Sequence, residues 1–296
     1  MDLSAFAQIW ILFALASAFF HASRLAVTKR LSPSFSARAL TFYVNLASLA
    51  VTLPLILWYH DFPLHQPAYV LAVLCGGVLS GLGGWALNAA LHRSEVSLVG
   101  PLMTLTPGLA IAIEWLLTGA LPAPLGWLGV GLLILGGYTL GIDERGIRWH
   151  RPLRTPGRRL ALLAAACFAA ASVFGRIGIQ LSDPLSFAVM VAMVNPLVLL
   201  VVFGLQDRRF YAELTGATAL RELRPLLLLG VLFALMRIAD QIALSLALAS
   251  YVMAVKRSAG IFSVLLGRWL FAEPYPRTRL LGASIMLLGV LVLTLG

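Results

Sequence analysis

Charged residues are scarce in this sequence: Asp, Glu, Lys and Arg make up 11% of its 296 residues, whereas hydrophobic residues make up 60%. Soluble domains have about 25% charged and 45–50% apolar residues. The composition therefore excludes an ordinary soluble protein. Cysteine is also rare, and Cys75 and Cys167 both lie within apolar runs, so neither a disulfide framework nor a metal site is expected. We expect a protein that works within a membrane and needs no cofactor.

Long apolar runs separated by proline and glycine turns predict the spans. A bilayer core takes roughly 20 residues per helix, so ten helices use about 200 residues and leave about 96 for loops. The runs lack the alternating pattern of barrel strands. We therefore predict an all-α integral membrane protein with ten transmembrane helices, at residues 5–28, 37–58, 68–91, 97–118, 124–142, 159–181, 185–205, 225–249, 252–271 and 278–296.

Basic residues outnumber acidic ones by 22 to 12, which gives a formal net charge of +10. They are dispersed among apolar segments, so we expect no nucleic-acid partner. On these boundaries, sixteen of the 22 lie in the five loops on one side of the bilayer or within two residues of them, and none lies on the other side. The positive-inside rule makes the basic loops cytoplasmic and both termini external. We predict a multi-pass protein of the bacterial inner membrane, a monomer or weak homodimer in lipid.

The second half of the chain repeats the first. Setting each residue against the one 153 positions later aligns Gly129 with Gly282 and Gly136 with Gly289. Residues 1–142 and 159–296 therefore form two five-helix repeats, joined by a basic cytoplasmic linker at 143–158. Because five is odd, the second repeat enters the membrane inverted. Inverted repeats are typical of carriers that alternate access around a site near the membrane midplane.

Three stretches carry a resemblance to a known family: AFFHASRLAVTK at 18–29, EVSLVGPLMTLTP at 95–107 and ASYVMAVKRSAGIFSVLLGRWLFAE at 249–273. The chain resembles the ten-helix EamA-type members of the drug/metabolite transporter superfamily. The resemblance implies a central cavity lined by the first, third, fourth, sixth, eighth and ninth spans, and a cargo of small metabolites, amino acids or drugs. The family's Glu at the end of the fourth helix matches Glu273, whereas the first repeat has Ala120 there.

Charges inside the spans are the candidates for function, because intramembrane charge is costly and usually faces a cavity, a partner or a helix end. They are Arg24, Arg176, Arg237, Lys256, Arg257 and Arg268, with the acids Glu114 and Asp240.

The hairpin of the eighth and ninth spans has the densest charge. Measured from its turn near Ser250, Lys256 lies about 9 Å along one helix and Asp240 about 15 Å along the other, within a lysine's reach. Arg237 is one turn from Asp240, and Arg257 follows Lys256. One interpretation is a structural Lys256–Asp240 pair, with Arg237 bonding helix-end carbonyls. The other is that at least one basic group faces the cavity and holds an anionic group of a substrate.

The remaining charges allow two interpretations each. Arg176 either lines the cavity or extends to the interface, and Arg24 and Arg268 are expected to extend to the cytoplasmic interface. Glu114 either pairs with Arg176 or binds protons. In small four-helix relatives a membrane carboxylate couples protons to cation export, and by resemblance Glu114 or Asp240 could do so here.

Several neutral polar residues are further candidates for substrate contact. His21 could hydrogen-bond a substrate or relay a proton, or be a packing residue. Asn88 and Gln241 are repeat counterparts on spans that the family uses for its cavity. Asn45 and Asn195 are also counterparts, and we expect them to cross-link helices. Tyr251 could stack on a ligand or anchor a helix end.

These observations favour a secondary active transporter of a small polar metabolite, anionic or zwitterionic, such as an amino acid or organic anion, working by alternating access in efflux or exchange. The alternative is a proton-coupled exporter of cationic drugs or metabolites that uses Glu114 or Asp240. A channel or structural subunit is a third reading. We do not expect an enzyme, because the best catalytic candidates, His92, Ser94 and Glu95, only share a short loop.

Overall fold

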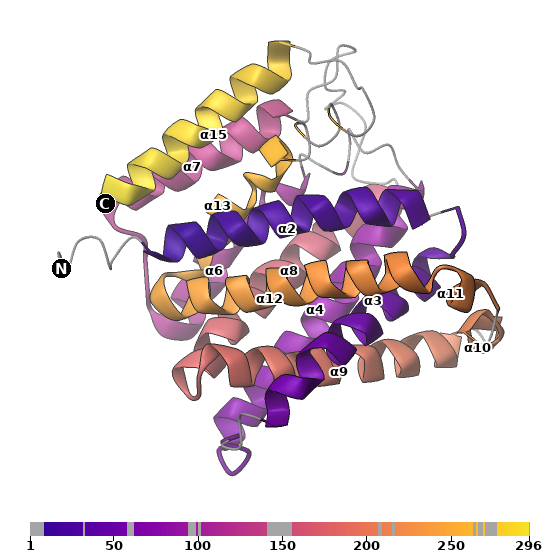
Figure 1. Ribbon diagram of the computed structural model, residues 1–296. Helices are drawn as coiled ribbons and strands as arrows, with labels where there is room; N and C mark the ends of the chain where they lie inside the picture. The colour runs from indigo at the N-terminus through magenta and orange to yellow at the C-terminus, as the bar shows by residue number, and fades with distance from the viewer. Residues whose placement is uncertain are drawn as a thin grey trace.

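The computed structural model is a bundle of α-helices (Figure 1). It describes residues 9–31, 33–57, 62–93, 99, 102–140, 156–206, 209–214, 217–262, 265, 269 and 277–295, and within these ranges it has no β-strand. The first half contains α2 (Ile9–Leu31), α3 (Ala37–Thr52), η1 (Leu53–Leu57), α4 (Pro67–Arg93), α6 (Thr106–Thr118) and α7 (Pro124–Leu140). The second half contains α8 (Pro156–Gln180), α9 (Pro184–Gln206), α10 (Arg209–Leu214), α11 (Ala217–Arg221), α12 (Leu223–Leu246), α13 (Ala249–Lys256) and α15 (Arg277–Leu295).

Turn chemistry fixes where many of these helices begin and end. Helices α4, α7, α8 and α9 each begin at a proline, whose fixed φ suits the first helical position and whose missing N–H costs nothing there. Gly119, with φ of 70°, ends α6 in the left-handed conformation that glycine adopts without strain. Asp183 Oδ1 caps α9 by accepting from the backbone nitrogens of Leu185 and Ser186 at 2.9 and 3.0 Å.

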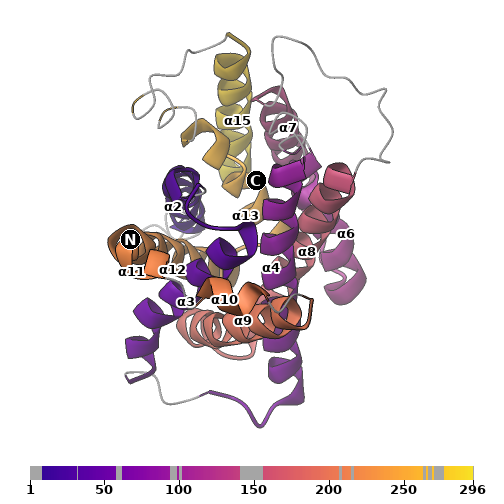
Figure 2. The ribbon, with the colours of Figure 1, turned by 90° about the vertical axis from the view of Figure 1, so that its right-hand side faces the viewer.

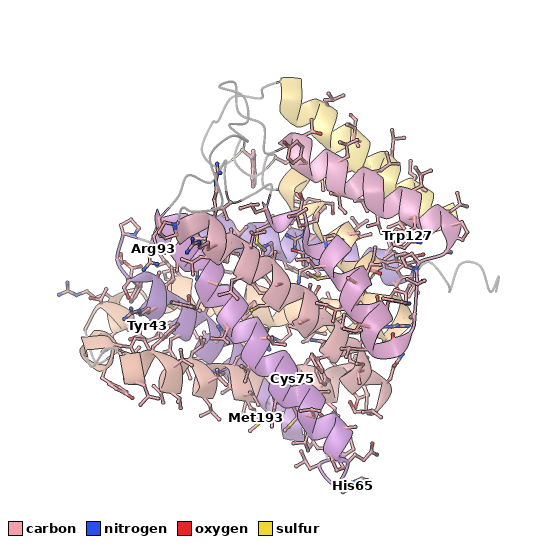
Figure 3. All side chains as sticks on the ribbon, turned by 180° about the vertical axis from the view of Figure 1, so that it is seen from behind. Tyr43, His65, Cys75, Arg93, Trp127 and Met193 are labelled. Carbon is pink, nitrogen blue, oxygen red and sulfur yellow. The ribbon has the colours of Figure 1, made fainter. Side chains whose placement is uncertain are left out.

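The all-α membrane fold predicted from the sequence is confirmed. Helices α2, α4, α8, α9 and α12, and α3 with the start of η1, are long and apolar enough to cross a bilayer, and α6, α7 and most of α15 are shorter apolar helices. Large apolar side chains such as Leu116 and Leu205 are exposed, as expected of a surface that lipid covers. In Figure 3, α4 runs from the side of His65 past Cys75 to Arg93 across the whole bundle.

Three of the predicted spans differ in their helix geometry from the prediction. The second span, expected to continue to residue 58, leaves α-helical geometry after Thr52 and continues as η1, because Pro54 has no N–H to donate to the preceding turn. In the fourth span, expected at 97–118, a turn at Thr104 and Leu105 precedes α6. The ninth span, expected at 252–271, begins as the short helix α13, and Glu273 lies outside the described residues, as does Arg268.

The helices pack with a pseudo-two-fold symmetry between the halves. Helix α4 packs on α8 as α12 packs on α2, and α4 contacts α9 as α12 contacts α3. Helices α7 and α15, α3 and α9, and α6 and α13 pair with their own counterparts, and α7 and α15 lie side by side in Figures 1 and 2. Each of these three pairs therefore lies at the axis that relates the repeats.

Glycines in the α7–α15 pair show that the repeats are inverted. A Cβ at Gly136 would lie 2.8 Å from the Gly282 carbonyl oxygen, and one at Gly129 would lie 3.1 Å from that of Gly289. The later glycine of α7 thus faces the earlier glycine of α15, so the two helices run antiparallel. Small residues at both positions let the backbones touch, as in other membrane helix pairs.

We predict that Gly136→Ala destabilises the protein by about 1–3 kcal/mol, the usual cost of overpacking a well-packed contact, because the new methyl group would meet the Gly282 and Met286 backbones at 2.8 and 2.7 Å. Thermal unfolding of the purified protein in detergent measures the change. Gly131→Ala in the same helix is the control, since its Cβ would meet nothing within 4 Å. Equal melting temperatures for the two variants would contradict the close contact.

Candidate functional site

Asp240 of α12 lies at the centre of a group of polar side chains from three helices. Its Oδ1 accepts a hydrogen bond from Ser17 Oγ of α2 at 2.6 Å, and its Oδ2 forms an ion pair with Lys256 Nζ at the end of α13. Lys256 and Asp240 are mostly buried, with 12% and 15% of their side chains exposed. The predicted Lys256–Asp240 ion pair within the hairpin is therefore present. Ser17 of α2 binds the other carboxylate oxygen of Asp240.

Three guanidinium groups surround this ion pair. Arg24 of α2 and Arg237 of α12 each lie 4.9 Å from the centroid of the Phe233 ring, a distance at which a cation is attracted to the face of an aromatic ring. Arg24 Nη2 is also 3.4 Å from His21 Nδ1. Arg257 Nη1 donates to the Met103 carbonyl oxygen at 3.2 Å. We call these residues the central cluster: Ser17, His21, Arg24, Arg237, Asp240, Lys256 and Arg257.

The second partner of Arg237 is the side-chain amide of Asn195 in α9. This amide has two orientations: in one, its nitrogen donates to Asn45 Oδ1 at 3.1 Å, and in the other, its oxygen accepts from Arg237 Nη2 at 2.7 Å. A guanidinium group only donates hydrogen bonds, so we assign the second orientation. In both orientations the Asn195 amide lies 3.1 Å from Asn45 Oδ1, but only the first forms the expected hydrogen bond between α3 and α9.

The central cluster carries an excess of positive charge. Four cations and one carboxylate leave a formal charge of +3 when His21 is neutral, and all four cations interact electrostatically with Asp240. Lys256 neutralises Asp240 directly. The guanidinium partners in the described part of the chain are neutral: an aromatic ring, an imidazole, an amide and a backbone carbonyl. The cluster is thus held together without being charge-balanced.

Two arginines have contacts that differ from an interpretation of the sequence. One of the two interpretations of the hairpin had Arg237 bonding helix-end carbonyls, but Arg237 lies near the middle of α12 and contacts Phe233 and Asn195. Arg24 was expected to extend to the interface, but the close packing of α2 on α12 brings Phe233 under its guanidinium. A sequence signal for Arg24 exists, since Ser17, His21 and Arg24 at positions i, i+4 and i+7 share one helix face.

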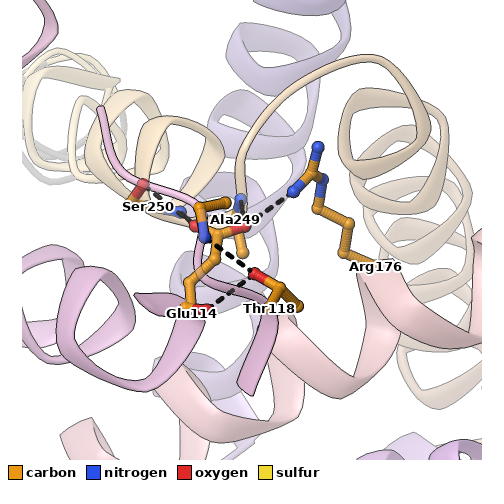
Figure 4. Close-up of polar contacts among 6 residues, drawn as sticks. Glu114, Thr118, Arg176, Ala249 and Ser250 are labelled. Atoms are coloured by element: carbon orange, nitrogen blue, oxygen red, sulfur yellow. Dashed lines mark hydrogen bonds and ion pairs between the residues drawn. The ribbon is translucent and has the colours of Figure 1, made fainter. Parts of the chain in front are cut away.

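A second charged group joins α6, α8 and α13 (Figure 4). Glu114 is 1% exposed; its Oε1 accepts from Arg176 Nη1 at 3.1 Å and from the Ala249 backbone nitrogen at 2.9 Å, and its Oε2 accepts from the Ser250 nitrogen and Oγ at 3.2 and 3.1 Å. The carboxylate thus caps the N-terminus of α13, where the helix dipole favours negative charge. We call Glu114, Arg176, Ala249 and Ser250 the Glu114 latch.

Tyr251 strengthens the same end of the bundle. Its hydroxyl accepts a hydrogen bond from the Ala123 backbone nitrogen at 2.9 Å, and its ring stacks on Trp10 with centroids 6.1 Å apart. A Cβ at Gly126 would collide with this hydroxyl, so a larger residue there would displace the Tyr251 ring. The polar group and the ring face of Tyr251 that were candidates for ligand contact therefore contact the chain itself.

The repeat counterparts Asn88 and Gln241 have different surroundings. Asn88 Nδ2 donates to Thr41 Oγ1 at 2.5 Å and so links α4 to α3. Gln241 is 8% exposed, packs beside Gly175 of α8, and its Oε1 has no hydrogen-bond partner among the described residues. Gln241 thus has a buried side-chain oxygen that accepts no hydrogen bond from the described residues.

Both halves break their fourth helix at the same position. The turn at Thr104 and Leu105 and the turn at Arg257 and Ser258 are related by the offset of 153 residues. A break releases backbone carbonyls from the helix, and that of Met103 accepts hydrogen bonds from Thr106 Oγ1 at 2.6 Å and from Arg257. Arg257, at one break, thus satisfies a carbonyl freed at the other.

The inverted helical repeats, with broken helices and buried charge at the repeat interface, define the protein as a membrane transporter. The model of the EamA-like transporter family matches residues 8–141 and again 155–295. The chain therefore belongs to the EamA-like transporter family, as its resemblance predicted, and is a multi-pass membrane protein of the drug/metabolite transporter type. Members of this family are transporters and not enzymes.

Solved structures support the same fold. One of them, titled "Crystal structure of protein", superposes with a TM-score of 0.74 at 20% sequence identity and covers 98% of this chain and 97% of its own. A search of curated proteins finds no match.

We predict that Glu114→Ala lowers the stability of the protein by about 3–5 kcal/mol, the usual effect of removing one partner of a buried ion pair, because Arg176 and the first turn of α13 lose their acceptor. Thermal unfolding of the purified protein measures the loss. The control is Glu222→Ala, since Glu222 precedes α12 without a side-chain capping bond. A melting temperature for Glu114→Ala no lower than that of the control would show that the latch does not hold the three helices.

Proposed function

We propose that this protein is a secondary active transporter that moves a small polar metabolite, anionic or zwitterionic, across the cytoplasmic membrane by alternating access. The observation that carries the proposal is the central cluster, where the hydrogen-bond and ring partners of Arg24, Arg237 and Arg257 among the described residues are neutral. The only negative charge near them in that part of the chain is Asp240, which Lys256 already neutralises. A buried cation is stabilised by a negative group nearby. Organic anions and amino acids supply that group as a carboxylate, which an arginine can bind through two parallel hydrogen bonds.

The symmetry of the bundle supports alternating access. Two inverted repeats can exchange conformations, so that a site between them opens first to one side and then to the other. The Glu114 latch joins three helices at one end of the bundle, the end where α2 begins and α15 ends in Figure 1. With the basic loops assigned to the cytoplasm, this end faces outward, and the latch must open when substrate leaves or enters there in efflux or exchange.

The contacts of the two acids weigh against a cation exporter. Glu114 accepts four hydrogen bonds, two of them on each oxygen, which leaves little room for a cationic substrate or a proton. Asp240 is engaged by Ser17 and Lys256. A cationic drug at the central cluster would meet four like charges. The carboxylates therefore serve better as partners of the protein's own cations.

The proposal predicts that Arg24→Gln reduces uptake roughly 10- to 100-fold, because a hydrogen bond to a charged group is worth about 1.5–3 kcal/mol. Lys256→Ala combined with Arg257→Ala should abolish transport. Liposomes containing the purified protein are screened with radiolabelled amino acids and carboxylic acids, with and without a pH gradient, and the variants are compared with the substrate that the wild type accumulates.

Arg30→Gln is the matched control for Arg24→Gln, since Arg30 lies in the same helix but is exposed. It should transport at the wild-type rate. Full activity after removal of both Lys256 and Arg257 would refute the site. Loss of transport in the Arg30 variant to the same degree as in the Arg24 variant would show that the effect is not specific to Arg24.

The orientation predicts a reporter result. A C-terminal alkaline phosphatase fusion should be active in bacterial cells and a C-terminal green fluorescent protein fusion dark, because the positive-inside rule puts the C-terminus outside the cytoplasm. Fusions after residue 150, in the basic linker, should give the reverse pattern. A fluorescent C-terminal fusion would overturn the assignment and with it the outward position of the Glu114 latch.

A further inference from the structure

We infer that the substrate is a dianion, a small molecule with two negative charges. This inference rests on the proposed function, and it narrows the substrate class from anions and zwitterions in general. It starts from the charge of the central cluster. Lys256 and Asp240 neutralise each other as an ion pair, which leaves the three guanidinium groups of Arg24, Arg237 and Arg257 to be balanced.

These three charges cannot be removed by deprotonation, because a guanidinium group stays protonated in proteins. Their partners in the described ranges are dipoles: the Phe233 ring, the Asn195 amide, the His21 ring nitrogen and the Met103 carbonyl. Dipoles stabilise a cation but do not cancel its charge, and like charges repel at short range in a medium of low dielectric constant. The central cluster is therefore electrostatically suited to more than one negative charge.

Buried hydrogen-bond donors without a partner give a second, independent estimate of how many negative groups the site can bind. The Nε atoms of Arg24 and of Arg257 are both buried without a hydrogen-bond partner among the described residues. Arg24 belongs to α2 and Arg257 directly follows α13, and both helices contact Asp240, through Ser17 and Lys256. A buried donor without a partner is costly, so each atom favours an acceptor from outside the chain. Two such donors from different segments match two negatively charged acceptor groups.

A zwitterion fits this site less well than a dianion. Its ammonium group would need a carboxylate, and Asp240 already holds Lys256 and Ser17. A monoanion would satisfy one arginine and leave the second unpartnered. Two carboxylates on a short chain, or one phosphate monoester, would supply both charges. The shared chemistry is a dianion small enough to lie between α2, α12 and α13.

The test compares probes that differ by one charge and little else. Thermal unfolding of the purified full chain is titrated with malonate, succinate, glutarate and glycerol 3-phosphate, and with the monoamide of each diacid and the methyl ester of the phosphate, at constant ionic strength. We expect at least one dianion to raise the melting temperature with an apparent affinity 10-fold or more above that of its singly charged partner. Counterflow in liposomes then establishes which dianion source, carboxylate or phosphate, is transported.

Variants assign the charge preference to the arginines. In Arg24→Gln or Arg257→Gln the ratio of dianion to monoanion affinity should fall about 10-fold, whereas Arg24→Lys, which keeps the charge, and Arg30→Gln, which is exposed on the same helix, should keep it. A merely structural arginine would weaken both probes equally and leave the ratio unchanged. The ratio is thus readable in a variant of reduced stability.

The outcomes separate this inference from the proposed function. Monoanions or amino acids that stabilise the protein as well as dianions do would overturn the dianion while leaving an anion or zwitterion transporter in place. An unchanged ratio in both arginine variants would likewise overturn it. Stabilisation by organic cations alone, or by no probe in the panel, would count against the inference and the proposed function together.

Discussion

The Asp240 carboxylate is the interaction on which the polar centre of this protein depends. It is shared by Ser17 of α2 and Lys256 of α13 while it belongs to α12, so it ties together helices from both repeats. Without it, four cations would repel one another in an environment where charge is poorly solvated. Lys256 alone is matched to it. The central cluster is therefore held together by Asp240 but keeps a net positive charge. This net charge distinguishes it from a structural ion pair and would suit a negatively charged ligand.

The scaffold is symmetric, whereas its chemistry is not. Asn45 and Asn195 meet between α3 and α9, and the glycines of α7 and α15 meet in the same reciprocal way. The counterparts of Asp240, Lys256 and Arg257 at an offset of 153 residues are the uncharged Leu87, Met103 and Thr104. The repeats thus provide two equivalent halves of the scaffold, and the second repeat, with α2, provides the charges of the central cluster.

The sequence predicted contacts within a hairpin or between repeat counterparts, because helical rise and the repeat offset suffice to place them. Lys256 with Asp240 and Asn45 with Asn195 are of this kind. The contacts of Arg24 with Phe233 and of Arg237 with Asn195 could not be predicted, because each joins two helices whose adjacency only the packing of the two halves determines. The four hydrogen bonds that Glu114 accepts could not be predicted for the same reason. Three of the four donors belong to α13: the backbone nitrogens of Ala249 and Ser250 and the Ser250 hydroxyl.

Helix α13 connects the two charged groups. Its first residues, Ala249 and Ser250, are bound to Glu114, and its last, Lys256, is bound to Asp240. Eight residues of α-helix span about 12 Å and behave as a rigid rod. A bound anion that competes with Asp240 for Lys256 would weaken the hold on one end of this rod, and the turn at Arg257 and Ser258 lets that end move. The same displacement would act on the Glu114 latch at the other end, so substrate binding and opening of the latch would be linked through a single short helix.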